Sequence, residues 1–424
     1  MLDIKLFRED PEKIKEDLKR RPDFDTLIVD NVIEADNKWR ELKRELDELK
    51  SVKNKESKAI SELKKKGEDI KSQVQKVGKL SDQIKQKEEE LDSLEEDRNN
   101  LLVKVPNILD PEVPKGQDDE ENKEIRTFEN KPEFNFKLRN HQEICVLNDW
   151  YDLETAAKHS GSRFYYLKNE LLMLQISLYN FVLNKLMSKG YSLVEVPPML
   201  RRESMGKSVS LDDFEEVIYK IEDEDLYLIG TSEHALAMLH DNQTINHKEL
   251  PLKYAGLSPC FRKEAGVTKD SKGIFRVHNF NKIEQFIFAK EEQSDELLNE
   301  LIDNAEEIFK ELGIHYRIVD ICSGDIGNFA SRKFDLEAWL PGQENYREMV
   351  SASNYRSYGA RRLNVRYQDS DSEIKFCHTL NSTAIALTRT LIAIIENNQT
   401  EDGNVRIPKV LRQYFGGREL LKQG

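Results

Sequence analysis

The sequence predicts an α+β protein, with an N-terminal antiparallel two-helix coiled-coil arm followed by a larger body in which helices and strands interleave. Three observations lead to this prediction: a long apolar repeat at coiled-coil spacing, an acidic, proline-punctuated segment after it, and mixed helix and strand patterns beyond residue 140. The 424 residues suffice for two or three domains and a large core. We expect the arm over 1–112, a linker over 113–135 and the body over 136–424.

The predicted coiled coil covers about residues 28–105, which contain few glycines and no proline. Apolar residues follow alternating steps of three and four along the first half, and the pattern resumes after "KKKGED". Gly67 lies where the pattern breaks, so it marks a reversal between two helices. Because the connection is short, the helices must pair as an antiparallel hairpin, each on the order of 50 Å long.

Charge is unevenly distributed along this hairpin. Residues 50–87 contain twelve lysines and five acids, a net charge of +7, whereas "EEELDSLEED" near the base is acidic. On a single helix such a run is more often a solvated face. At the far end of a long arm it favours contact with a phosphate backbone. The candidate nucleic-acid-binding residues are Lys53, Lys55, Lys58, Lys64, Lys65, Lys66, Lys71, Lys76 and Lys79.

The composition excludes several classes of protein. The formal net charge is −14, which argues against indiscriminate binding of polyanions. No apolar stretch approaches the roughly 20 residues of a membrane helix, and the N-terminus lacks the apolar core of a signal peptide. The four cysteines are far apart and form no CxxC or Cys/His cluster. We therefore expect no membrane segment, no disulfide framework, and a reducing, cytoplasmic location.

Helices and strands alternate in the body. "LLMLQISLYNFVLNKLMSKG" has helical spacing and ends at Gly190, after which "YSLVEVPPML" reads as a short strand. "DLYLIGTSEHALAMLH" predicts a strand, a turn and a helix, and "LKYAGLSPCFRKEAG" predicts a strand leading to a loop. In "FCHTLNSTAIALTRTLIAIIEN" we expect a strand end, a polar turn and a helix whose first turns contain Ser382, Thr383 and Arg389.

The stretch "GIFRVHNFNKIEQFIF", residues 273–288, reads as a strand of unusual character. Alternation would place Arg276, His278, Phe280, Lys282 and Glu284 on one face. Such a mixed row lies in water on an edge strand, or it lines a cavity whose occupant is charged. The residues alone leave both interpretations open.

Familiar nucleotide and nucleophile motifs are absent from the sequence. It contains no GxGxxG, no GxxxxGK[ST] and no nucleophile elbow. Two arginines nevertheless need partners: Arg262 directly after a strand, and Arg389 inside an apolar helix. An internal ion pair would satisfy Arg389 as well as a bound phosphate would.

Taken in order, these segments resemble the motifs of the class II aminoacyl-tRNA synthetases, and specifically the seryl-tRNA synthetase family. "GYSLVEVP" resembles the first motif, with its proline at Pro197, and "FRKEAG…GIFRVHNFNKIEQF" resembles the second. "NSTAIALTR" resembles the third, with its arginine at Arg389, and "GTSEH" resembles the Thr-x-Glu loop that binds serine. The hairpin resembles the tRNA-binding arm of this family. The resemblance covers essentially the whole chain.

The resemblance implies a class II synthetase antiparallel sheet flanked by helices, a catalytic domain over 136–424, and a homodimer formed largely through the first motif. It implies that ATP and L-serine give seryl-adenylate and pyrophosphate, and that the seryl group passes to the 3′ end of tRNA(Ser), bound through the arm. Charging of tRNA(Sec) is left open. Two alternatives also stay open: a related ligase that activates an amino acid for a carrier protein, and a coiled-coil interaction protein with a non-catalytic body.

The resemblance also implies roles for individual residues. Arg262, Arg276 and Arg389 would be catalytic, because they neutralise the phosphates and the attacking carboxylate. Phe280 would stack on the adenine, and Mg²⁺ would be held with ATP by Glu348 and Ser351. The implied ATP-binding residues are Arg262, Lys263, Glu264, Val277, Phe280, Glu348, Met349, Val350, Ser351 and Arg389.

The serine pocket follows from the same resemblance. Glu233 would receive the ammonium group, and Glu284 with Thr383 would bind the hydroxyl group. The implied serine-binding residues are Thr231, Ser232, Glu233, Arg262, Glu284, Asn381 and Thr383. A pocket that uses the substrate hydroxyl to satisfy its own polar groups rejects alanine and glycine strongly. We expect no editing domain and no metal beyond Mg²⁺.

Overall fold

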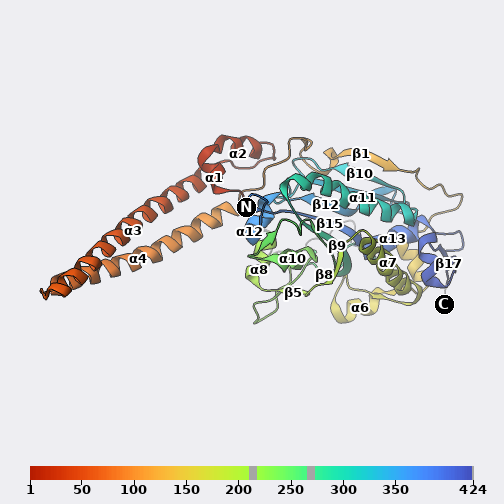
Figure 1. The fold of residues 1–424 in the computed structure, drawn as a ribbon. Helices are drawn as coiled ribbons and strands as arrows, with labels where there is room; N and C mark the ends of the chain where they lie inside the picture. The colour runs from red at the N-terminus through yellow and green to blue at the C-terminus, as the bar shows by residue number, and fades with distance from the viewer. Residues whose placement is uncertain (210–216, 265–272, 423–424) are drawn as a thin grey trace. The chain divides into compact units, whose positions relative to one another are not determined.

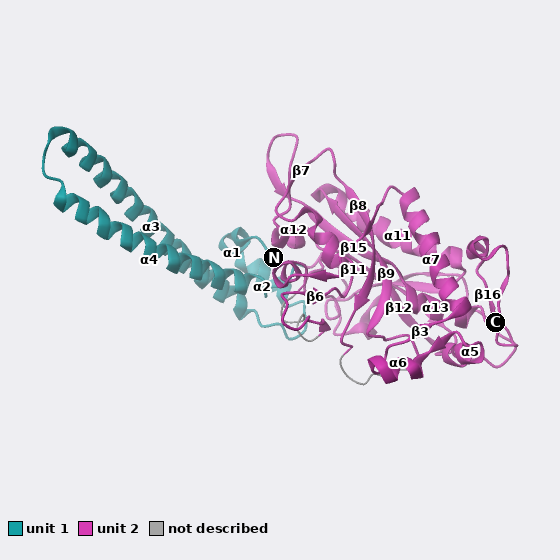
Figure 2. Cartoon of the chain, turned by 90° about the horizontal axis from the view of Figure 1, so that it is seen from below, with its two compact units in different colours: residues 1–108 teal, residues 109–424 magenta. Residues whose placement is uncertain are grey.

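The computed structural model describes residues 1–209, 217–264 and 273–422. The chain divides into two compact units, residues 1–108 and residues 109–424 (Figure 2). The loop predicted after the strand in "LKYAGLSPCFRKEAG" falls largely outside the described residues. Within the described ranges, no helix combines the length and the apolar character that crossing a membrane requires.

The first unit is a helical hairpin with a short helical base. Helices α1 (Ile4–Glu9) and α2 (Pro11–Leu18) precede α3 (Leu27–Lys66) and α4 (Lys71–Leu102), which run antiparallel (Figure 1). Gly67 ends α3 in the left-handed conformation, with φ +77°, and its backbone N–H caps the helix. At 1.5 Å per residue, the 40 residues of α3 span roughly 60 Å. The predicted pair of long helices with a reversal at Gly67 is confirmed.

The hairpin is held by a short apolar seam and by charged pairs. The buried part of the seam consists of Leu42, Leu46, Ile84 and Leu91. The next pairs are ionic: Glu45 with Lys87 at 2.7 Å, Lys50 with Glu88 at 2.7 Å, and Lys76 with Glu56. Since exposed pairs contribute little, most of the hairpin's stability lies in its proximal half.

The second unit is built on one eight-stranded sheet. Its order is β1-β10-β11-β12-β15-β9-β8-β4, and all neighbouring pairs are antiparallel except β4 with β8. The strands in that order are β1 (Lys123–Phe128), β10 (Tyr316–Asp320), β11 (Arg332–Leu340), β12 (Asn345–Asn354), β15 (His378–Ala386), β9 (Asn279–Ala289), β8 (Leu252–Phe261) and β4 (Ser192–Glu195). The predicted, largely antiparallel sheet is confirmed.

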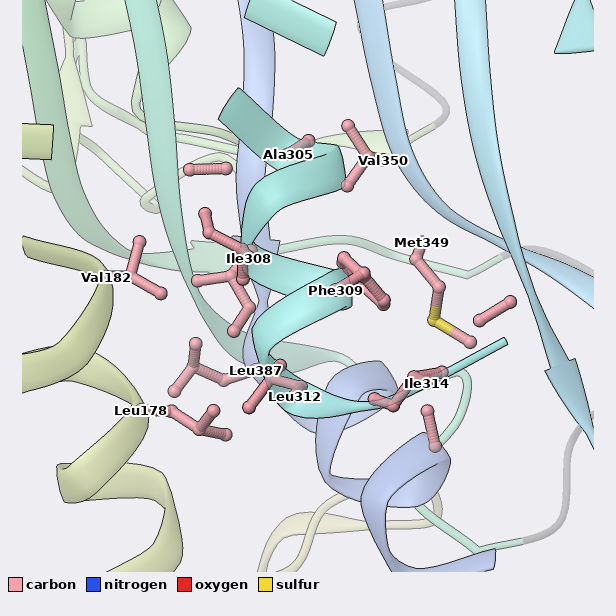
Figure 3. Packing of buried hydrophobic residues seen from close by; sticks show 14 of the residues in the cluster. Leu178, Val182, Ala305, Ile308, Phe309, Leu312, Ile314, Met349, Val350 and Leu387 are labelled. Atoms are coloured by element: carbon pink, nitrogen blue, oxygen red, sulfur yellow. The ribbon is translucent and has the colours of Figure 1, made fainter. Parts of the chain in front are cut away.

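Helices cover one face of this sheet and form the main core with it. The three long ones are α7 (Asn169–Ser188), α11 (Ser294–Leu312) and α13 (Leu387–Asn397). Figure 3 shows Ile308 and Phe309 of α11 packed among side chains from α7, β12 and α13. The strands contribute alternate residues to this core, so the remaining alternate residues must point to the opposite face.

Shorter elements complete the second unit. The helices are α5 (His141–Leu147), α6 (Leu153–Ser160), α8 (Arg202–Ser208), α10 (Glu233–Ala237) and α12 (Ser357–Leu363). The strands are β2 (Tyr151–Asp152), β3 (Tyr166–Leu167), β5 (Met199–Leu200), β6 (Tyr227–Leu228), β7 (Thr244–Asn246), β13 (Arg366–Gln368), β14 (Ile374–Phe376), β16 (Val405–Arg406) and β17 (Leu420–Leu421). All four cysteines are buried and free.

The segment predicted as a linker over 113–135 is part of the second unit. It contains β1, which pairs with β10 at the edge of the large sheet. Gly116 lies so close to Cys322 that a Cβ there would meet Cys322 Sγ at 2.7 Å. The side chains of β1 are almost all exposed, and backbone hydrogen bonds hold the strand in place. A short, exposed edge strand without apolar alternation therefore has the composition of a linker.

Two other boundaries differ from the prediction. Strand β9 begins at Asn279 and not at 273, because its partner β8 ends at Phe261, directly opposite Asn279. Ser382 and Thr383 lie in strand β15 and not in a turn and helix, because they pair with Ala352 and Glu284. In both cases the length of a neighbouring strand decides the boundary.

Candidate active site

The face of the sheet opposite the long helices is polar at its centre. In β9, Ile283 and Ile287 point into the helix-covered core, so Phe280, Lys282 and Glu284 point to the other face. Lys282 and Glu284 are buried, with exposed fractions of 6% and 2%. The mixed row predicted from the sequence thus lines an interior site and does not lie on an edge strand.

Two β-bulges bring further polar residues to this face. Asp335 pairs with Ser351 and Glu337 with Glu348, so one extra residue of β12 lies between these pairs. Because Asp335 and Glu337 share a face of β11, their partners Ser351 and Glu348 also share one. Strict alternation along β12 would have placed Glu348 and Ser351 on opposite faces.

The second bulge lies in β15. Thr383 pairs with Glu284 and Ile385 with Ile283, which leaves Ala384 as the extra residue. Both Ala384 and Ile385 are then free to enter the core, while Thr383 stays on the polar face beside Glu284. The strand thereby supplies one polar and two apolar side chains within three positions.

A buried, connected cluster occupies the junction of β9 and β15. Lys282 forms an ion pair with Glu284. The Lys282 ammonium donates to Thr383 Oγ1 at 3.4 Å, and Thr383 Oγ1 donates to Glu284 Oε2 at 3.3 Å. Since both charges are nearly fully buried, this arrangement is costly unless its groups are matched to one another or to a ligand.

Glu233, the first residue of α10, faces this cluster. Its Oε1 accepts a hydrogen bond of 2.9 Å from the Tyr355 hydroxyl, which in turn accepts one of 2.9 Å from Asn381 Nδ2. Burial and the neighbouring Glu284 raise the pKa of Glu233 to about 7. A carboxyl group poised near neutrality in this way is suited to receive a cationic group.

Arg262 stands directly after β8, between two cavities. Its Nε donates to the Gly230 carbonyl oxygen at 3.3 Å, and its guanidinium lies 5.4 Å from the centre of the Phe280 ring. Arg276 lies 3.7 Å from Glu264, which follows Arg262 by two residues. The fork of Arg262 is therefore oriented by backbone and aromatic contacts on the wall of the site.

Arg389, near the start of α13, lies on the opposite wall of the smaller cavity from Arg262. Its Nη1 donates to the Glu348 carbonyl oxygen at 2.8 Å and lies 3.7 Å from the Glu348 carboxylate. The Glu348 side chain is 50% exposed and that of Arg389 is 20% exposed. Partial loss of hydration opposes ionisation of Glu348, but Arg389 and Lys333 outweigh it and lower the pKa of this carboxyl group. The internal ion pair considered for Arg389 is present, and its carboxylate still reaches solvent.

The two cavities share Arg262 in their linings. The larger, of about 440 Å³, also involves Thr231, Glu233, Lys333, Ser351 and Tyr355. The second, smaller cavity is lined by Arg262, Glu264, Phe275, Arg276, Val277, Phe280, Lys282, Glu348, Met349, Thr383, Ala386, Thr388 and Arg389. The structure thus brings most of the sequence-predicted site residues of the second unit together around one arginine.

Three predicted residues are placed differently. Ser232 is fully buried and donates its hydroxyl to the Gly256 carbonyl oxygen at 3.0 Å, so this hydroxyl braces α10 against β8. Val350 lies in the helix-covered core, beside α11 in Figure 3. Lys263 donates its backbone N–H to Val217 and does not line either cavity.

The sequence reasoning gave no role to four polar residues of this face: Lys282, Lys333, Asp335 and Tyr355. Burial raises the pKa of Asp335 to about 7, against the effect of Lys333 at 3.2 Å. The alternation of "RKFDLE" could have identified Lys333 and Asp335 as one polar face. Nothing in the sequence singles out Tyr355, which enters the site from the segment after β12.

Comparisons with known proteins agree with this geometry. The family "Seryl-tRNA synthetase N-terminal domain" matches residues 1–109, and "tRNA synthetase class II core domain (G, H, P, S and T)" matches residues 218–398. The serine–tRNA ligase of Methanospirillum hungatei JF-1 is 47% identical over 425 residues, covering 99% of this chain and 100% of the relative. The chain belongs to the seryl-tRNA synthetase family.

Solved structures of this family resemble the whole chain. The ATP complex of the seryl-tRNA synthetase from Pyrococcus horikoshii has a TM-score of 0.92 and 44% identity and covers 100% of both chains. The AMP complex of the cytoplasmic serine–tRNA ligase from Naegleria fowleri has a TM-score of 0.87 and 39% identity, covering 100% of this chain and 99% of that one. As a member of the seryl-tRNA synthetase family, the chain is a ligase.

Proposed function

We propose that this ligase joins L-serine to tRNA(Ser) in two steps. ATP and serine first give seryl-adenylate and pyrophosphate, and the seryl group then passes to the 3′ end of the tRNA. The observation that carries the proposal is the pair of charge-lined cavities that share Arg262. The ATP bound to the Pyrococcus horikoshii relative supports ATP as the nucleotide.

The smaller cavity would take the nucleotide. Arg262 would contact the α-phosphate, with Arg276 and Arg389 contacting the outer phosphates, because guanidinium forks match phosphate oxygens. Phe280 would stack on the adenine. Glu264 and the backbone at Val277 would contact the adenine edge, and the backbone of Lys263, Met349 and Val350 would shape the wall. Apart from Lys263 and Val350, all of these residues line the smaller cavity.

The donors Glu348 and Ser351 fit a magnesium ion. Both are oxygen ligands, the bulge brings them to one face, and the lowered pKa of Glu348 keeps its carboxylate ionised. Mg²⁺ bound with ATP would neutralise charge on the phosphate oxygens. Among the described residues, no group of three or more His, Cys, Asp or Glu side chains forms a metal site, so further ligands would be phosphate oxygens and water.

The cluster around Glu233 and Glu284 would bind serine. Glu233, with Thr231 beside it, would accept the ammonium group, and Arg262 would hold the carboxylate. Glu284 and Thr383 already share a hydrogen bond of 3.3 Å, into which the serine hydroxyl would insert. Alanine and glycine would leave these buried groups unsatisfied, which supports discrimination by hydrogen bonding. Ser232 and Asn381 would act by orienting the pocket.

In this arrangement Arg262 would perform the central task of adenylate formation. It would bring together two anions that repel each other, the serine carboxylate and the α-phosphate. The carboxylate oxygen attacks phosphorus and pyrophosphate leaves, so no protein nucleophile is required. In the second step a ribose hydroxyl of the tRNA attacks the seryl carbonyl carbon, and AMP leaves.

The arm would bind the tRNA, and the body would dimerise. The predicted nucleic-acid-binding lysines of the hairpin tip are exposed apart from Lys53, and positive charge there would meet phosphates. On α7, Leu172, Met173 and Ile176 are 40–44% exposed, an apolar strip that supports a homodimer contact at this helix. Four buried, free thiols support a reducing, cytoplasmic location.

Pyrophosphate exchange with each amino acid in turn tests the proposal. Serine is expected to drive exchange, and alanine, glycine and threonine to drive at least about a hundredfold less. Serine transfer to tRNA(Ser), but not to a carrier protein, then separates a tRNA ligase from the carrier-protein alternative. A tRNA(Sec) transcript in the same assay decides whether that second acceptor is used. Absence of serine-dependent exchange would overturn the proposal.

A further inference from the structure

Three residues from distant parts of the chain form one hydrogen-bonded relay at the wall of the larger cavity. Asn381 of β15 donates to the Tyr355 hydroxyl at 2.9 Å, and that hydroxyl donates to Glu233 Oε1 at 2.9 Å. A phenol has one proton, so accepting from Asn381 leaves that proton free to be given to Glu233. The direction of the relay is therefore fixed: it ends on the carboxylate.

The middle member of the relay is firmly held. The backbone N–H of Tyr355 donates to the Thr379 carbonyl oxygen at 2.9 Å, and the Tyr355 ring packs edge-on to Phe329 at 5.8 Å. Burial, and then the negative charge of Glu233, raise the pKa of the Tyr355 phenol well above its usual value. The hydroxyl therefore keeps its proton at neutral pH and remains a donor.

Groups from several elements act on the Glu233 carboxylate. Glu284 of β9 opposes its ionisation, whereas Lys282 of β9 and the hydrogen bonds from Tyr355 and Asn381 favour it. Lys282 is itself engaged by Glu284. Among the described residues, His234, Arg262 and Lys333 are the other charged or titratable side chains that line this cavity. The relay is thus the direct hydrogen-bonding support of a carboxylate that burial destabilises.

We propose that Tyr355 is a positioning residue for amino-acid recognition, which with Asn381 holds Glu233 in the orientation that receives the substrate's ammonium group. This inference rests on the proposed function. It assigns a role to a residue that lines the larger cavity and not the smaller one, and that acts on the ammonium group through Glu233. The affinity for the amino acid would then depend on how the segment after β12 is positioned against β15, because that packing places the Tyr355 hydroxyl.

Tyr355→Phe tests the inference, since it removes one hydroxyl and keeps the ring. Hydrogen bonds to charged groups are strong, so the KM for serine in pyrophosphate exchange is expected to rise about tenfold or more, with the KM for ATP unchanged. Loss of the donor also raises the pKa of Glu233. The acid limb of kcat/KM for serine is then expected to move to higher pH.

Tyr316→Phe is the matched control. The Tyr316 hydroxyl donates to Glu306 at 2.8 Å, a buried tyrosine–carboxylate bond of the same kind on the helix-covered side of the sheet. This variant is expected to keep the wild-type KM for serine and the wild-type pH profile. If both variants lose activity equally, or if Tyr355→Phe loses it equally at every pH, Tyr355 is merely structural and the inference falls.

Asn381→Ala gives a second reading, which also serves if Tyr355→Phe fails to fold. It removes the donor to the phenol together with the hydrogen bond of Asn381 to Glu233 itself, and is expected to shift the acid limb in the same direction. An unshifted limb in Asn381→Ala, with folded protein, overturns the relay. Wild-type protein without serine-dependent exchange would refute the proposed function, whereas wild-type exchange with an unaltered Tyr355→Phe would refute only this inference.

Discussion

The hairpin of the first unit and the polar face of the second use the same charged residue types under opposite conditions. On the distal hairpin, lysines stand in water, and their ion pairs, such as Lys50 with Glu88, are 43–46% exposed. On the sheet face, the side chains alone of Lys282 and Glu284 are 8% and 3% exposed, and each contacts Thr383. Exposed, screened charges on the hairpin can attract a charged partner only when many of them add up. The buried charges on the sheet face act individually, because each one is held in a fixed position.

This contrast has an exception inside the hairpin. At its base Asp36 is buried, with both oxygens of its carboxylate bound by Arg8 at 2.7 Å, and Arg98 lies 3.3 Å away. Arg98 also covers the Trp39 ring at 4.4 Å. The base of the hairpin therefore contains a buried, hydrogen-bonded charge cluster like that of the sheet face, whereas the ion pairs of the distal hairpin are exposed. Four substitutions or deletions, from the largest expected effect to the smallest, test the difference.

Removing the arginine shared by both cavities should have the largest effect. Arg262→Ala is expected to lower serine-dependent pyrophosphate exchange about a thousandfold, because no other group would hold both anions. Thermal unfolding should change little, since Arg262 is at the cavity wall. Arg418→Ala, which breaks the exposed pair with Glu170 at 2.9 Å, is the control and should retain activity. Unchanged exchange in Arg262→Ala would remove this residue from the mechanism.

Deleting the distal hairpin, about residues 40–95, should separate the two units by function. The cut ends lie across from each other, as the ion pair between Asp36 and Arg98 beside them indicates. We expect serine-dependent exchange to stay within about twofold of the full chain, and tRNA(Ser) aminoacylation to fall about a hundredfold or more. Equal charging by the shortened protein would refute a tRNA-binding role for the arm.

Breaking the buried pair at the base should destabilise the hairpin. Asp36→Ala leaves Arg8 and Arg98 without their carboxylate and is expected to cost about 3 kcal/mol of local stability, measured by hydrogen exchange of α3 amides in the full chain. Lys87→Ala at an exposed pair should cost less than about 1 kcal/mol. Equal losses of stability at the two sites would mean that the buried pair at the base contributes no more than an exposed pair.

The same pair predicts a pH dependence. Burial opposes ionisation of Asp36, but Arg8 and Arg98 outweigh it and lower the pKa of this carboxyl group. A lowered folded-state pKa contributes stability that is present above the unfolded value of about 4 and is lost as the pH falls through the folded value. The protection of α3 amides should therefore drop at acid pH in wild type and not in Asp36→Ala.

Neutralising lysines at the tip should give the smallest effect. The double substitution of Lys55→Gln and Lys58→Gln is expected to weaken tRNA binding about three- to tenfold and to reduce the salt slope by about two units, with exchange unchanged. Lys38→Gln, at an exposed pair with Glu34 near the base, is the matched control. An unchanged salt slope in the double variant would mean that these two lysines do not contact phosphate.

Much of the candidate site could be predicted because its residues lie in short motifs. Arg262, Glu284 and Arg389 were all assigned to it from sequence, and all three line the smaller cavity or bond to a residue that does. The Val350 side chain lies on the helix-covered side, which could not be foreseen, because motif membership does not state which side a strand residue faces. Tyr355 was missed, because its position depends on pairing between segments far apart in the chain.

The sequence by itself determined the hairpin, since apolar periodicity and Gly67 are local signals and each helix is stabilised by its neighbour along the chain. Only the tertiary structure decided which polar groups share the sheet face. A bulge reverses strict alternation, so Glu348 and Ser351 lie together although their spacing places them apart. A bulge is an extra residue in one strand relative to its partner, so it arises only when the two strands pair. The sequence of either strand alone does not reveal it.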